Sequence, residues 1–286
     1  MRINYEPCLV VLLIVLLSGC IGVATLVDRD LSYHKIAKSA KFERAYLKTE
    51  YFTLAACYRF QKPGESVNIY IEGDGNAWMS HGRISNNPTP RAPLVLKLAT
   101  IDESANVAYL TRPGQYLEQE DLNVKPCYWS DKRFSEEVIV SMNDAVSKLA
   151  QLAQTDKINL IGYSGGAAIA VLISTRRNDI VSLRTIAGNL DIEAVSKYHN
   201  VSPLTGSLNP IDFAQKIKGL PQRHFIGLKD TIVPSSVAES FVARMGDKDY
   251  SRITEVSGAT HSKGWTKYWK ELLRYPVSEA QLPANN

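Results

Sequence analysis

The chain has little of what metal sites and nucleic-acid surfaces are built from. It contains four cysteines and five histidines, with no CxxC motif and no spacing typical of zinc ligands, so no metal site is expected. Its 33 Lys and Arg residues are nearly balanced by 29 Asp and Glu, and the basic residues are scattered singly or in pairs. Nucleic-acid binding needs clustered basic residues, so the sequence argues against such a partner.

The composition is that of a globular protein. Hydrophobic residues make up 45% of the chain and charged residues 22%, which excludes disordered and collagen-like classes. The length of 286 residues would allow two domains, but single α/β domains commonly reach roughly 250 residues. One domain after a short leader therefore fits the length.

The N-terminus has the pattern of a secretory signal. Arg2 precedes an uninterrupted apolar run over 9–17, and the small residues Ser18 and Gly19 follow. The four residues ending at Cys20 resemble the bacterial lipobox, in which this cysteine is diacylated and becomes the mature N-terminus. The resemblance implies a signal peptide over 1–19, a tether over 20–39 and a domain over 40–286.

An uncleaved membrane anchor is the alternative. No charged residue occurs from Pro7 to Val27, which is long enough for the ~20 residues of a spanning helix. Either alternative tethers the chain to a lipid bilayer outside the cytoplasm. The residue after Cys20 is Ile21 and not an aspartate. By the same resemblance, this implies that the protein is anchored in the outer membrane of a Gram-negative cell and faces the periplasm.

Cys57 and Cys127 are the cysteines that remain in the domain. In an oxidising compartment they either form one disulfide or stay as two free thiols. The sequence leaves both alternatives open, because pairing depends on a Cα distance that it does not contain.

Strands and helices alternate along the domain. Runs rich in β-branched and aromatic residues that end in turn residues predict strands, and apolar residues at helical spacing predict helices. This alternation predicts a mostly parallel central sheet with helices on both faces. The strands are expected over 67–71, 107–110, 157–162, 182–187, 224–228 and 252–256, and the helices over 134–154, from 165 onward and over 263–275.

One predicted strand leads into a helix through a G-x-S-x-G motif centred on Ser164. This context predicts a nucleophile elbow, in which the serine lies on a strained turn and exposes its hydroxyl. Gly162 and Gly166 would allow the strand and helix to pack closely. The N–H of Gly165, at the helix N-terminus, would stabilise an oxyanion.

A serine nucleophile needs a base and an acid that orients the base. Asp230 and His261 follow two later predicted strands, in the order Ser, Asp, His that this fold requires. They are therefore the predicted acid and base. Asp191, after an intervening strand, is the reserve acid.

A second oxyanion donor is expected in the turn after the strand over 67–71. Glycines flank Asp74 there, and they would let the N–H of Asp74 or Gly75 point at the oxyanion. A plain Asp-Gly turn is the alternative for this segment.

These motifs together resemble the α/β-hydrolase superfamily, and more narrowly exported bacterial hydrolases or lipoproteins with an EGDG-x-AW turn. The resemblance covers roughly residues 40 to 275 and implies a serine hydrolase of the esterase, lipase or thioesterase kind, with no metal or organic cofactor. Glu72 stands where the more familiar HG turn of lipases and esterases has a histidine. The resemblance also implies that relatives often carry a cysteine at the position of Gly114, which would pair with the later cysteine; with Gly114 here, Cys127 pairs with Cys57 or stays free. The motifs are Tyr70 to Trp78, Gly162 to Gly166, Asp230 to Pro234, and His261.

The sequence therefore predicts a membrane-tethered hydrolase that cleaves carboxylic esters or thioesters through an acyl-enzyme. The loops over 80–105 and 188–222 are too short for a large lid, so a minimal cap is expected. The expected partner is a small-molecule acyl ester or thioester, with either a modest acyl group or a partly open cleft. A serine peptidase or acyltransferase would use the same covalent intermediate. A binding or assembly lipoprotein of the cell envelope that keeps the fold without turnover is the alternative from another class.

Overall fold

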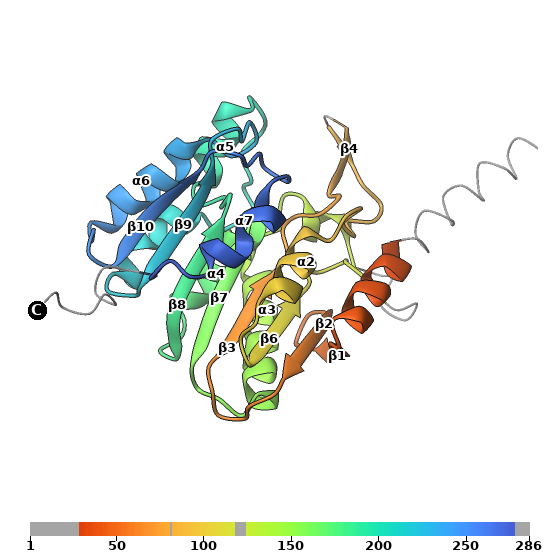
Figure 1. The fold of residues 1–286 in the computed structure, drawn as a ribbon. Coiled ribbons are helices and arrows are strands. Elements are labelled where there is room, and N and C mark those ends of the chain that lie inside the picture. The colour runs from red at the N-terminus through yellow and green to blue at the C-terminus, as the bar shows by residue number, and fades with distance from the viewer. Residues whose placement is uncertain (1–28, 81, 118–123, 278–286) are drawn as a thin grey trace, which may run out of the picture.

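A computed structural model describes residues 29–80, 82–117 and 124–277. The expected signal peptide, Cys20 and the first part of the expected tether lie outside these residues. Within them, eight strands form one sheet in the order β1-β2-β6-β3-β7-β8-β9-β10 (Figure 1). The strands are β1 (Glu43–Lys48), β2 (Thr53–Phe60), β3 (Val67–Ile71), β6 (Asn106–Leu110), β7 (Ile158–Tyr163), β8 (Ile180–Ile186), β9 (Gln222–Gly227) and β10 (Ser251–Val256).

The sheet is antiparallel from β1 to β6 and parallel from β6 across β3 to β10. Parallel strands are covered on both faces, which is why β6 and β9 are buried along their whole length. Chain order reverses around β3, since β6 lies on one side of it and β7 on the other. Ligand sites of parallel sheets lie at such a point, outside the carboxyl ends of the strands.

Helices cover both faces of the sheet. The apolar side chains of α2 (Leu94–Ile101) and α7 (Trp265–Leu272) belong to one buried cluster, and those of α3 (Glu136–Leu152), α4 (Gly165–Ser174) and α6 (Ser235–Met245) belong to the other. Buried residues run the whole length of α4, as its apolar sequence requires. Three further helical segments lie between the strands: η2 (Pro126–Trp129), α5 (Ile192–Tyr198) and η3 (Pro210–Ile217).

The predicted strands and helices are present, with ends that differ by up to three residues. The strand expected over 67–71 is β3, and the helix expected over 134–154 is α3. Leu152 belongs to the apolar stripe that predicted α3, but it is 48% exposed because it is the last residue of the helix. The β1–β2 hairpin and a smaller hairpin of β4 (Trp78–Ser80) and β5 (Arg83–Ile84) were not predicted.

Residues 29–39 form a helix that packs on the domain. Tyr33 and Ala37 are buried in the same cluster as α2 and α7, and the ring of Tyr33 stacks on Tyr116 with centroids 4.6 Å apart. The second half of the segment assigned to a tether is therefore folded against the core. Among the described residues, no helix combines the length and the apolar character that crossing a bilayer requires.

Cys57 and Cys127 are free thiols in this structure. Cys57 lies on β2 in the buried cluster beneath helix 29–39, whereas Cys127 lies in η2 and is half-buried. The sequence leaves open a disulfide or two free thiols, and the structure has the two free thiols. Burial raises the pKa of the Cys57 thiol to about 12, so this side chain is an inert part of the core.

Candidate active site

Ser164 lies on a strained turn between β7 and α4. Its backbone has φ of 51° and ψ of −119°, a conformation that residues other than glycine rarely adopt. A Cβ at Gly162 would lie 2.4 Å from the carbonyl oxygen of Gly166, and one at Gly166 would lie 2.3 Å from that of Ile71. The turn therefore requires both glycines of the motif, for the reason expected from the sequence.

The side chains of Ser164, His261 and Asp230 form one hydrogen-bonded line. The Ser164 Oγ lies 3.0 Å from His261 Nε2, and His261 Nδ1 lies 2.9 Å from Asp230 Oδ2. The three residues follow β7, β10 and β9, so the carboxyl ends of three parallel strands bring them together. The structure thus brings together the three residues that the sequence selected, with the imidazole between the hydroxyl and the carboxylate.

Asp230 is fixed in its ionised form. Its side chain is 2% exposed, and its Oδ1 accepts hydrogen bonds from the N–H groups of Ile232 and Val233, at 2.8 and 3.0 Å. Burial raises its pKa, but the hydrogen bond and charge of His261 together with these two amides outweigh burial and lower the pKa overall. A carboxylate is therefore available to orient the imidazole and to stabilise its protonated form.

Two aromatic side chains fix the backbone of the histidine. The hydroxyl of Tyr163 and the indole N–H of Trp265 both donate to the carbonyl oxygen of His261, at 3.1 and 2.9 Å. Trp265 is fully buried at the start of α7, so the loop that carries the imidazole is attached to the core.

The reserve acid Asp191 and two other histidines have partners outside the candidate site. Asp191 caps α5, where its Oδ1 accepts from the N–H of Ala194 at 3.1 Å. His224 is buried beside Thr185, with its Nδ1 2.8 Å from the hydroxyl, and burial lowers its pKa to about 3. His199 contacts the carbonyl oxygen of Ile232. None of these contacts involves Ser164.

The turn after β3 packs directly on the elbow. A Cβ at Gly165 would lie 1.9 Å from Asp74 Oδ1, so the Asp74 side chain lies against the Gly165 Cα. Gly165 begins α4, where an N–H has no intrahelical partner. Gly75, with φ of 63°, instead packs against Pro88 and Gln115. The predicted oxyanion residues Gly165 and Asp74 are therefore adjacent, whereas the Cα of Gly75 faces the next loop.

Two arginines hold the Asp74 carboxylate. Arg112 Nη1 lies 3.4 Å from Oδ1 and Arg133 Nε lies 3.3 Å from Oδ2. Arg112 is 4% exposed, and burial lowers its pKa to about 10, which leaves it protonated at neutral pH. Both guanidinium groups lie over the ring of Phe134, at 5.3 and 5.4 Å. This cluster fixes the side chain that borders the elbow.

Glu72 lies beneath the same turn and is fully buried. Its Oε1 accepts from the N–H of Gly73 at 3.0 Å, and its Oε2 accepts from the hydroxyl of Tyr109 at 2.9 Å. Burial raises the pKa of this carboxyl to about 7. Gln115 donates to the carbonyl oxygen of Gly73 at 3.0 Å. Two buried side chains thus fix the backbone just before Asp74.

Sequence reasoning did not assign these roles to Arg133 or Tyr109. Arg112 and Gln115 come within five residues of the end of a predicted strand, and this position in the sequence predicts that they lie near the site, although not which groups they contact. Arg133 lies 59 positions after Asp74 in the sequence, in a loop, and the residues around it contain no pattern that predicts this contact.

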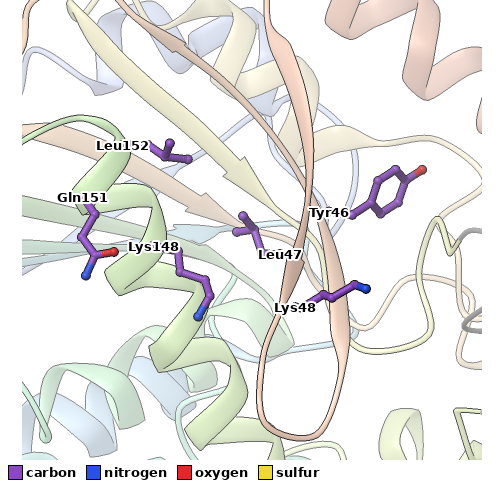
Figure 2. Close-up of a pocket in the computed structure, with 6 residues that line it drawn as sticks. All are labelled: Tyr46, Leu47, Lys48, Lys148, Gln151 and Leu152. Carbon is purple, nitrogen blue, oxygen red and sulfur yellow. The ribbon is translucent and has the colours of Figure 1, made fainter.

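An open hollow elsewhere on the surface is not part of this arrangement. It lies between the edge strand β1 and the end of α3 (Figure 2). Its lining residues come from an antiparallel strand and a helix terminus, away from the loops that carry Ser164 and His261. They are Tyr46, Leu47, Lys48, Lys148, Gln151 and Leu152.

The arrangement supplies an aligned serine, imidazole and carboxylate beside backbone N–H groups at a helix N-terminus. These are the components of covalent acyl transfer. Within the described part of the chain, no group of three His, Cys, Asp or Glu side chains is placed to hold a metal ion.

No protein-family model and no curated protein matches the chain. Solved structures do match. An esterase of Pyrococcus furiosus is 17% identical with a TM-score of 0.59, and the match covers 83% of this chain and 92% of the esterase. An alpha-beta serine hydrolase homologue from Coxiella burnetii is 18% identical with a TM-score of 0.53, over 81% of this chain and 95% of the homologue.

An acylaminoacyl peptidase of Pyrococcus horikoshii is 13% identical with a TM-score of 0.57, and the match covers 86% of this chain but 43% of the peptidase. At such identities the likeness concerns the fold. The chain has the α/β-hydrolase fold, with a mostly parallel eight-stranded sheet between helices, and the fold prediction is confirmed.

Proposed function

We propose that the protein is a serine hydrolase that cleaves carboxylic ester or thioester bonds through an acyl-enzyme, while tethered to the cell envelope. The hydrogen-bonded line from Ser164 through His261 to Asp230 is the observation that carries the proposal. The likeness to esterases and serine hydrolases supports the reaction class without identifying the substrate.

In the first half-reaction, Ser164 Oγ attacks the acyl carbon and His261 Nε2 accepts the hydroxyl proton. The carbonyl oxygen becomes an oxyanion, which the N–H groups of Gly165 and of the Asp74 turn stabilise. The bond to the leaving group then breaks, and His261 returns the proton to the departing alcohol or thiol. Asp230 stabilises the imidazolium that exists between these two steps.

In the second half-reaction, water replaces the leaving group. His261 takes a proton from the water as its oxygen attacks the acyl carbon of the Ser164 ester. Collapse of the second tetrahedral intermediate breaks the bond to Oγ, and the proton returns to serine. The products are a carboxylic acid and the regenerated enzyme, so the cycle consumes one water.

Labelling with a fluorophosphonate probe tests the chemistry directly, because the probe traps an activated serine. We expect the purified full-length protein to be labelled and Ser164→Ala to remain unlabelled. A panel of p-nitrophenyl esters of increasing chain length, with Ser164→Ala as the control, would then report the acyl preference. Absence of labelling in a folded sample would overturn the hydrolase and favour a binding or assembly role.

The tether is a separate part of the proposal. It rests on the signal-like segment and the lipobox-like residues ending at Cys20. Incorporation of labelled palmitate in the cell, lost in Cys20→Ser, would support lipidation. Unchanged labelling in that variant would refute Cys20 as the lipid site.

A further inference from the structure

The β4–β5 hairpin presents large apolar side chains to solvent beside the candidate active site. Trp78, Met79 and Ile84 are 41%, 53% and 38% exposed, although the hairpin directly follows the turn that carries Asp74. Figure 1 shows this hairpin projecting beyond the body of the molecule. Exposed apolar side chains that gather on one surface mark an interaction site.

More exposed apolar side chains lie across the candidate site from the hairpin. They belong to the loops and the helix end that follow β8 and β9, on the same carboxyl edge of the sheet. His199 joins two of these segments through its contact with the carbonyl oxygen of Ile232. Together with the hairpin they form what we term the apolar rim: Trp78, Met79, Ile84, Tyr198, Val201, Leu228 and Ile232.

The chain enters the domain at this same edge. Arg29 Nη1 donates to the carbonyl oxygen of Thr89 at 3.0 Å, and Asp30 lines a small hollow together with Asn86 and Asn87, which follow the hairpin. Eight residues separate Arg29 from Cys20. A chain of that length spans at most about 30 Å. A lipid on Cys20 would therefore hold the hairpin base within that distance of the membrane.

We infer that the apolar rim docks on the bilayer to which the chain is tethered, and that the substrates are esters whose acyl chains lie in that bilayer. The inference rests on the hydrolase function and tether proposed above. Tryptophan is favoured at the membrane interface, where its ring contacts acyl chains and its N–H stays hydrated. Docking in this orientation turns Ser164 toward the lipid, so that an acyl ester reaches the nucleophile without crossing water.

Quenching by brominated lipid tests the docking, because bromine on acyl chains quenches indoles that lie among them. The full-length, processed protein would be bound to phosphatidylcholine vesicles with ordinary or brominated acyl chains. Trp78 is the exposed tryptophan, whereas Trp129, Trp265 and Trp269 are buried. We expect brominated vesicles to reduce the emission of the wild type, Trp78→Phe to abolish this loss, and Trp129→Phe to retain it. Equal wild-type emission with both kinds of vesicle overturns the proposal, whether the protein binds the vesicles without being quenched or does not bind them at all.

A kinetic comparison tests the substrate class. Met79→Ser combined with Ile84→Ser should lower hydrolysis of a vesicle-borne p-nitrophenyl palmitate several-fold relative to that of soluble p-nitrophenyl acetate. The matched control is Leu152→Ser, an equally exposed apolar residue at the opposite edge of the sheet, which should leave this ratio unchanged. An unchanged ratio in the hairpin variant refutes the lipid substrate. Quenching requires no turnover, so quenching without any hydrolysis or Ser164 labelling supports docking and refutes the hydrolase function alone.

Discussion

The carboxylate of Asp74 lies against the Cα of Gly165, on the residue that follows the proposed nucleophile. A methyl group at Gly165 would lie 1.9 Å from Asp74 Oδ1, and Arg112 and Arg133 hold that carboxylate in place. The turn after β3 therefore packs on the elbow through the Asp74 carboxylate, in addition to the close contacts that Gly162 and Gly166 make.

The Gly165→Ala substitution should slow labelling of Ser164 by a fluorophosphonate at least about tenfold, because it displaces Asp74 and moves the proposed oxyanion donors. Adding Asp74→Ala should restore part of the rate, since the two changes share one contact and such pairs are not additive. The measurement is the labelling rate of both single variants and the double variant. Gly219→Ala is the control for a glycine substitution remote from the site: the added Cβ has no atom within 4 Å, so it causes no clash and adds only the backbone strain of a φ of 84°. Additive effects of the two changes would contradict this account.

Asp230→Asn should lower kcat/KM by about 10⁴-fold, because the amide favours the wrong tautomer of His261 and cannot stabilise the imidazolium. Asp191→Asn is the matched control, since Asp191 caps α5 and asparagine caps a helix equally well. Steady-state hydrolysis of a p-nitrophenyl ester by both variants measures the difference. If Asp191→Asn abolished activity and Asp230→Asn did not, the assignment of the acid would be wrong.

Glu72 should make the free energy of unfolding depend on pH between its unfolded pKa and its folded one. Burial raises the folded pKa from the ordinary glutamate value of 4.5 to about 7, so the native state binds the extra proton in this range and stability falls as pH rises through it. The loss approaches about 3 kcal/mol when the carboxyl ionises fully in its buried site.

Glu72→Gln removes this titration and keeps an acceptor for the N–H of Gly73. Urea unfolding of wild type and variant at several pH values from 4 to 8 measures it. We expect the stability of the variant relative to wild type to increase with pH over this range. A constant difference between the two proteins would show that Glu72 keeps an ordinary pKa.

The sequence was sufficient for the parts of the site that depend on local patterns. A glycine-flanked serine between a β-rich run and an apolar run predicts an elbow, and the φ of Ser164 and the close contacts of Gly162 bear this out. Asp230 and His261 could be selected because each follows a predicted strand. Their order along the chain, serine before aspartate before histidine, is the one that this fold requires, although Asp191 in the same order remained a reserve acid until the structure placed it as the cap of α5.

The parts that depend on side-chain packing were not predictable. Arg133 and Asp74 meet through an irregular loop, and no periodic pattern links their positions. The β4–β5 hairpin is short, and its outward residues do not alternate with buried ones, so the period that identifies a strand is missing. Helix 29–39 buries Tyr33 and Ala37, although the sequence analysis assigned this segment to a tether because it follows the expected signal peptide.

The two domain cysteines should differ sharply in reactivity. Cys57 is fully buried and its pKa is raised to about 12 by burial, whereas Cys127 is half-buried in the loop η2. The thiolate is the reactive form, so iodoacetamide should modify Cys127 in the native protein and reach Cys57 only after unfolding. Peptide mass spectrometry of samples alkylated before and after denaturation measures this order, and Cys127→Ser should remove the fast reaction. A Cys57–Cys127 disulfide in the non-reduced map of protein purified from the envelope would contradict it, because the structure keeps Cys57 in the core beneath helix 29–39 and Cys127 outside that cluster.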